Sequence, residues 1–288
     1  MLRKLFKYDF LAIGKTMWLL TLIAVLITIA GTVSGYFIDD AFEKFLTDQN
    51  TIMYMALTFL LGTIIFVSFM AIVAYMVIST ILIMKRYYQN LFTDEGYLTF
   101  TLPVKTSAIL DAKVFSGLLW GAIASLVSIV GFILLIYALV GENVADVLDE
   151  FKMAVEYISG SIEIPTYHYV LFIVEYVLSI IINFVFGMLL LYFCITLATV
   201  IVKKARVILG VGLYIGVTSV LSALTQLVST ISSIFLSSQT VTTPSEAMAE
   251  AAVQMHIQMW FAIIIYGGVA VASYILNRYL LKNKLNLV

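Results

Sequence analysis

The residue most able to do chemistry inside an apolar environment is Glu175. It is the one carboxylate close to the interior of a long apolar region, and the residues from Tyr176 to Val202 carry no charge. A carboxylate in such surroundings is costly, so it indicates function. Two interpretations stay open. Glu175 either reaches back to the nearby membrane boundary beside Tyr169 at little cost, or it lies on a substrate path and contacts a cationic group there.

Other side chains that could carry chemistry are isolated. The two histidines, His168 and His256, each stand alone near the end of an apolar segment, which is typical of structural residues rather than metal ligands. The chain contains no G-x-x-x-x-G-K-[ST], H-E-x-x-H, C-x-x-C or G-x-S-x-G pattern. It therefore lacks a phosphate-binding loop and the common zinc-protease and hydrolase motifs. We predict that the chain is not catalytic by itself and binds neither a metal nor a cofactor.

The longest polar stretch between apolar segments runs from Lys85 to Lys113 and reads KRYYQNLFTDEGYLTFTLPVKTSAILDAK. Asp94, Glu95 and Gly96 place two carboxylates and a helix breaker in its middle. Pro103 is expected to end the element before it, and a helix is expected to lead from there into the next apolar segment. From the residues alone, this stretch is either a binding surface or an ordinary solvated loop.

Six uncharged segments, each 23 to 39 residues long, must position these residues. The chain is 62% hydrophobic and 11% charged, against about 45–50% and about 25% in soluble domains. A helix that spans a membrane needs about 20 apolar residues. We therefore predict an all-α integral membrane protein that forms a single transmembrane domain over residues 1–288, with spans at about 17–38, 52–84, 114–140, 170–202, 207–236 and 257–276. Soluble, disordered and disulfide-framework classes are excluded.

The charges predict an orientation for these six spans. Fourteen of the 16 basic residues fall on one side, and the exceptions are Lys44 and Lys152. Because basic residues concentrate in cytoplasmic loops, both termini and residues 85–113 are predicted to be cytoplasmic. The net charge of −1 gives no support for a nucleic-acid partner.

Three segments outside the spans have helical patterns. Over residues 1–15, apolar residues recur at helical spacing opposite Arg3, Lys4 and Lys7, which predicts an amphipathic helix lying along the cytoplasmic leaflet. Residues 143–159 show a similar apolar stripe outside. Residues 243–246 form a capping box with Pro244 at the first helical position, which predicts a helix leading into the last span.

The polar stretch resembles the region before the third span of ABC-2-type permeases. In that family a charged stretch, a Glu-Gly turn, apolar residues, a Pro-Val pair and a lysine occur in order. The residues here that match this order are Glu95, Gly96, Leu98, Leu102, Pro103, Val104 and Lys113. The sequence of this stretch is most similar to that of small uncharacterised permeases of Gram-positive bacteria. It departs from them at one position: the residue before the lysine, often a serine in these permeases, is Ala112 here. Six spans, cytoplasmic termini and an N-terminal amphipathic helix also agree with the family.

The resemblance implies the transmembrane subunit of an ATP-binding-cassette exporter in a bacterial plasma membrane. Such permeases pair, as homodimers or with a second permease, and a separate ATPase subunit hydrolyses the ATP. The resemblance also implies that the loop after the second span contacts this ATPase, here through Gln89, Asn90, Leu91, Phe92, Asp94, Glu95 and Gly96. Two alternatives remain: a secondary transporter, and a non-transporting membrane sensor or assembly protein.

Overall fold

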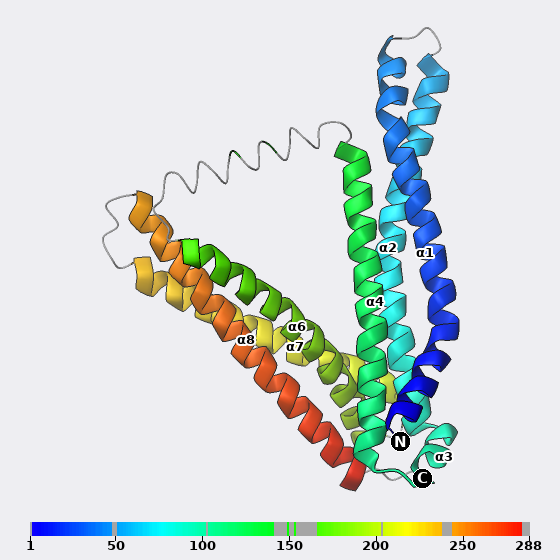
Figure 1. The fold of residues 1–288 in the computed structure, drawn as a ribbon, viewed down its shortest axis with the longest axis vertical. Helices are drawn as coiled ribbons and strands as arrows, with labels where there is room; N and C mark the ends of the chain where they lie inside the picture. Colours follow the sequence, from blue (N-terminus) through cyan, green and yellow to red (C-terminus); the bar gives the residue numbers. More distant parts are fainter. Residues whose placement is uncertain are drawn as a thin grey trace. The chain divides into compact units, whose positions relative to one another are not determined.

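The computed structural model describes residues 2–47, 51–101, 103–140, 166–202, 204–237 and 244–283, together with residues 149 and 153. These residues contain seven helices and no strand (Figure 1). The helices are α1 (Leu2–Thr47), α2 (Thr51–Phe92), α3 (Asp94–Thr101), α4 (Thr106–Val140), α6 (Thr166–Ile201), α7 (Arg206–Ser237) and α8 (Pro244–Asn283). The predicted all-α class is confirmed for this part of the chain.

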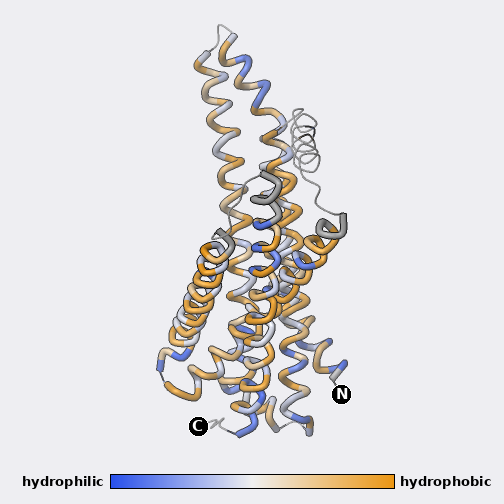
Figure 2. Tube along the Cα trace, turned by 90° about the vertical axis from the view of Figure 1, so that its left-hand side faces the viewer, coloured by the Kyte–Doolittle hydropathy of each residue, from blue (hydrophilic) through white to orange (hydrophobic). Residues whose placement is uncertain are grey.

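Six of these helices, all except α3, are long and apolar enough to cross a membrane. The shortest apolar segment among them has 30 residues, which is about 45 Å of helix against a hydrocarbon layer of about 30 Å. Figure 2 shows hydrophobic residues along most of their length. Many large apolar side chains also lie on the surface, including Phe59 at 78% and Ile231 at 64% exposure. These are the helices of a multi-pass membrane protein, as predicted.

The chain divides into two compact units, and the division crosses α2 and α4. The first unit comprises residues 1–86 and 111–152, and it therefore holds α1 and most of α2 and α4. The second unit comprises residues 87–110 and 153–288, which include the end of α2, all of α3, the start of α4, and α6, α7 and α8.

Small residues let the helices of the first unit approach closely. A β-carbon added at Gly31 would lie 2.3 Å from the Ser68 hydroxyl oxygen, and one added at Gly35 would lie 2.7 Å from the β-carbon of Ala138. The buried Ser68 also donates a hydrogen bond to the Ile27 carbonyl at 2.9 Å. The Leu135 side chain of α4 also lies against Gly31, so α1 packs closely against both α2 and α4.

The predicted N-terminal amphipathic segment is the first part of α1, which continues without a break from Leu2 to Thr47. Arg3, Lys4 and Lys7 are exposed, whereas Ile13 is buried. An amphipathic helix along the membrane surface, distinct from the first span, stays a prediction.

In the second unit, α6 is the central helix. It packs against both α7 and α8, and α7 also packs against α8. Half of the most apolar stretch of α6 is buried, but only 11% of the corresponding stretch of α7 is.

The connection from α6 to α7 is short. Within it, Ala205 has a φ of 57°, a left-handed conformation that costs an alanine about 1–2 kcal/mol. The turn brings Gly210 of α7 against Ile195 of α6.

The last long helix, α8, begins at Pro244 and continues to Asn283. The prediction of a helix that leads into the last apolar segment is therefore confirmed. Thr243 of the capping box lies outside the described residues, as do Leu102 and nearly all of residues 143–159.

Candidate functional site

Residues 85–113 form a helical corner in place of an extended loop. The helix α2 continues to Phe92, α3 follows at once, and α4 begins at Thr106. The predicted stop before Pro103 and the predicted helix into the next apolar segment are both confirmed. Asp94 and Glu95 lie in the first turn of α3, where the positive end of the helix dipole stabilises carboxylates.

Gly96 allows α3 to pack tightly against the end of α2. It is buried, and a β-carbon at this position would lie 2.6 Å from the Leu91 carbonyl oxygen. Its amide donates a hydrogen bond to the Thr93 carbonyl at 2.7 Å. The glycine therefore does not break a helix here. It lies in the first turn of one, because the corner leaves no room for a side chain.

The predicted ATPase-contact residues separate into a buried and an exposed group. The members on α2 are half-buried or buried, in chain order Gln89, Asn90, Leu91 and Phe92. On α3, by contrast, four side chains are exposed, and we call them the α3 surface: Asp94, Glu95, Tyr97 and Leu98. An external partner can therefore reach α3 more readily than the last turn of α2.

Tyr87 ties the end of α2 to α6 and α8. Its hydroxyl lies 2.8 Å from the Thr196 hydroxyl on α6 and accepts a hydrogen bond from the Asn277 amide on α8 at 3.0 Å. Its ring stacks on Tyr192 of α6 with centroids 4.0 Å apart. All four side chains are at most 2% exposed. Because polar groups in an apolar interior must satisfy one another, this cluster joins the corner to two long helices.

Glu175 lies in a second polar cluster, between α6 and α8, whose other two members are the half-buried His256 and the exposed Trp260. One carboxylate oxygen is 2.6 Å from Nδ1 of His256, and the other accepts a hydrogen bond from the Trp260 indole at 2.7 Å. The Glu175 side chain is only 3% exposed. The imidazole ring of His256 stacks on Phe172 with centroids 4.0 Å apart. The carboxylate contacts side chains of α8, and both interpretations of Glu175, a residue at the membrane boundary and one on a substrate path, stay predictions.

Sequence reasoning found Glu175 but missed His256 and Trp260 as its partners. It also missed the cluster around Tyr87, since Thr196 and Asn277 are single polar residues in apolar segments with no motif around them. The only available signal was the presence of polar side chains in spans, where each needs a partner. The described residues contain no group of three or more His, Cys, Asp or Glu side chains that could hold a metal ion.

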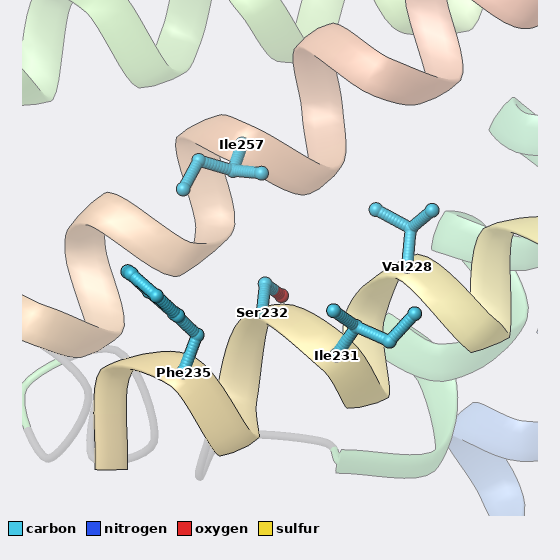
Figure 3. A pocket seen from close by; sticks show the side chains of 5 residues that line it. All are labelled: Val228, Ile231, Ser232, Phe235 and Ile257. Atoms are coloured by element: carbon cyan, nitrogen blue, oxygen red, sulfur yellow. The ribbon is translucent and has the colours of Figure 1, made fainter. Parts of the chain in front are cut away.

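A groove of about 430 Å³ lies between α7 and α8 (Figure 3). Figure 3 shows that α8 contributes Ile257 and that the other lining side chains come from α7: Val228, Ile231, Ser232 and Phe235. Beside the groove, the Gln258 amide of α8 donates a hydrogen bond to the Ser229 hydroxyl of α7 at 2.8 Å. With one hydroxyl among four apolar side chains, the groove suits an apolar group.

Comparisons with known proteins find no relative of this chain. No family model, no curated protein and no solved structure matches it. A function for the chain must therefore follow from its own residues and geometry.

Proposed function

We propose that the chain is the transmembrane subunit of an ATP-binding-cassette exporter, which pairs with a second permease and is driven by a separate ATPase. The observation that carries this proposal is the corner at residues 85–113. There a short helix with two exposed carboxylates and two exposed apolar side chains joins two long apolar helices. Such a helix can dock into a groove of a partner through a few apolar anchors and charges. The same residues carry the resemblance to ABC-2-type permeases.

The packing of the corner supports a coupling role. Gly96 holds α3 against the end of α2, so a force applied to α3 reaches the last turn of α2. From there the hydrogen bonds of Tyr87 lead to α6 and α8. In the proposed mechanism, ATP-driven closure of two ATPase subunits moves these helices and shifts the paired permeases between inward- and outward-facing states.

The proposed arrangement has both termini in the cytoplasm of a bacterial cell and the spans in its plasma membrane. The distribution of basic residues supports this orientation. Pairing is supported by α7, whose face at Gly212 and Gly216 has no atom within 4 Å of an added β-carbon. Small residues on an open helix face permit close contact with another helix in a membrane.

The experiment that tests this function is purification of the tagged chain from its own cells, wild type or Glu95→Ala, followed by identification of any ATP-binding-cassette ATPase that co-purifies with it. Removing one partner of a charge pair that is sheltered at an interface costs about 2–5 kcal/mol of binding free energy. We therefore expect Glu95→Ala to bind the ATPase about 30-fold more weakly, or worse. Substrate-stimulated ATP hydrolysis should fall as well. The melting temperature should stay unchanged, since Glu95 is exposed.

The matched control is Asp40→Ala, which removes an exposed carboxylate near the end of α1. It should retain the ATPase. If the two variants behave alike, Glu95 has no coupling role. If the wild-type chain binds no ATPase at all, the exporter proposal is wrong.

A second candidate function, a secondary transporter, is favoured by the buried Glu175 beside the half-buried His256, because such transporters use ionisable residues inside the membrane. The two functions differ in their energy source. Transport by proteoliposomes that contain only this chain and a proton gradient would support the second candidate over the first.

A further inference from the structure

The end of the α1–α2 pair that lies away from the termini is longer than a membrane span requires. A β-carbon added at Gly62 of α2 would lie 3.8 Å from Cδ1 of Ile38 on α1, so these two residues lie at the same level. The first charges of α1 after its apolar segment, Asp39 and Asp40, follow directly. From there α1 continues to Thr47, about 13 Å of helix, whereas the headgroup layer on each side of the hydrocarbon is only about 5–8 Å deep. The tip of this helical hairpin therefore reaches past the lipid.

Large apolar side chains are exposed on this tip, and we call them the tip surface. Their exposed fractions are 51% to 86%, and the residues are Phe42 and Leu46 of α1 and Ile52, Met55 and Phe59 of α2. Counted from the contact between Ile38 and Gly62, all five lie within about 80° in the same sense of rotation, at about 100° per residue. Because the two helices run antiparallel, the same sense leads to the same side of the hairpin. An exposed apolar face beyond the lipid marks an interaction site.

The segments between the predicted spans on this side of the membrane are strongly acidic. They carry 12 acidic residues and two basic ones, whereas the segments on the side of the termini carry four and 14. Acidic residues contribute little to the orientation of spans, so orientation does not explain the acidic excess. The twelve are Asp39, Asp40, Glu43, Asp48, Glu142, Asp146, Asp149, Glu150, Glu156, Glu163, Glu246 and Glu250. Those beside the tip surface on α1 are all exposed: Asp39, Asp40 and Glu43.

The charges select among the partners that could cover the tip surface. A second copy of this chain would bring the same carboxylates. The apolar stripe predicted for residues 143–159 belongs to a segment with four acidic residues and one lysine. Both would place like charges together, which weakens association. A partner that combines an apolar face with positive charges matches both features of the tip.

We propose that the tip surface binds a cationic amphipathic peptide that arrives from the side of the membrane opposite the termini. The apolar side chains of the peptide cover the tip surface, as in other amphipathic helices that bind through one face, and its lysine or arginine side chains lie near Asp39 and Glu43. Met55 adapts to apolar partners of different shape. The acidic segments attract the peptide over a distance, and salt screens this attraction.

The test measures the affinity of a fluorescent peptide for the purified full chain in nanodiscs of neutral lipid. The peptide is a helix of leucine and lysine with all leucines on one face, and empty nanodiscs give the background. Replacing both Ile52 and Phe59 by alanine should weaken binding at least about tenfold. The matched control replaces Phe66 and Ile81 by alanine, an exposed phenylalanine and isoleucine of α2 within the predicted span. It should keep the wild-type affinity.

Charge is tested on both partners. Asp39→Asn combined with Glu43→Gln should weaken binding about threefold at low salt and should reduce its salt dependence. A peptide with glutamate in place of lysine should not bind above the background. Equal affinities for the two peptides, or for the two pairs of alanine variants, would overturn the proposal.

A single cysteine shows what covers the tip surface when no peptide is present. Cys194 is the one cysteine of the chain, so Cys194→Ser with Phe59→Cys leaves one thiol, which should react with a membrane-impermeant maleimide. Bound peptide should slow this reaction. A thiol that does not react, or that forms a disulfide with a second copy, would mean that the chain itself covers the surface and would refute the proposal. None of these measurements uses ATP or an ATPase, so their outcome is independent of the proposed exporter function.

Discussion

The two units of the chain stabilise their helix contacts in different ways. In the first unit, Gly31 of α1 lies against the Ser68 and Leu135 side chains, and Gly35 lies against the backbone of Ala138. In the second unit, hydrogen-bonded clusters around Tyr87 and Glu175 join α8 to α6. Membrane helices associate through close packing and through polar contacts. Between the long helices, the closest glycine contacts lie in the first unit, beside the hydrogen bond from Ser68 to the Ile27 carbonyl, whereas two hydrogen-bonded clusters join α8 to α6 in the second.

One ion pair departs from this division. In the first unit, Asp9 of α1 pairs with Lys113 of α4, and their side chains are 13% and 6% exposed. Next to this pair, the Trp120 indole of α4 donates a hydrogen bond to the Phe10 carbonyl of α1 at 3.0 Å. The start of α1 is therefore tied to α4 by polar contacts. Further along α1, the Thr21 hydroxyl lies 2.9 Å from the Tyr75 hydroxyl of α2, so hydrogen bonds accompany the glycine contacts there as well.

The largest expected effect comes from Asp9→Ala. The variant leaves the buried Lys113 ammonium without the Asp9 carboxylate, and breaking a buried pair costs about 3–5 kcal/mol. Unfolding in mixed micelles, followed by circular dichroism, measures this loss. The double variant Asp9→Ala with Lys113→Met should recover part of the stability, since no charge is then left behind. A single variant that loses under about 1 kcal/mol would mean that the pair behaves as an exposed one.

An intermediate effect is expected from Gly35→Ala in the first unit. The added β-carbon would lie 2.7 Å from that of Ala138 and 3.1 Å from the Ala138 backbone, so the helices must move apart at a cost of about 1–3 kcal/mol. The matched control is Gly216→Ala on α7, where nothing lies within 4 Å. It should unfold at the wild-type denaturant concentration or above it, since alanine favours a helix over glycine by about 1 kcal/mol. Equal losses at the two glycines would contradict the division between the units.

The smallest effect is expected from Tyr87→Phe in the second unit. The variant keeps the ring stacked on Tyr192 but removes the hydroxyl that bonds to Asn277, which costs about 1 kcal/mol. Tyr36→Phe serves as its control, because Tyr36 is 77% exposed. The same unfolding assay compares the two. No difference between them would show that the polar cluster adds nothing to the stability of the second unit.

The sequence by itself determined that the chain is helical and that six of its helices can cross a membrane. Uncharged segments of 23 to 39 residues leave few other structures possible, since an apolar surrounding forces the backbone to satisfy its own hydrogen bonds. The sequence also predicted that a helix ends before Pro103 and that another begins at Pro244. A proline fixes its own backbone angle and cannot donate a backbone hydrogen bond, whatever residues surround it. The prediction that Gly96 breaks a helix was wrong. A glycine is needed at this position because the Leu91 carbonyl packs against it, and the sequence does not show that contact.

Only the tertiary structure decided which polar residues meet. Glu175 and His256 are 81 residues apart, and Tyr87 and Asn277 are 190 apart. In a soluble protein, the apolar stripe of a helix shows which face is buried. In a membrane the faces toward lipid and toward protein are both apolar, so periodicity does not show which side of α6 packs against α8. The partners of a buried carboxylate therefore follow from helix packing, which no local pattern of residues encodes.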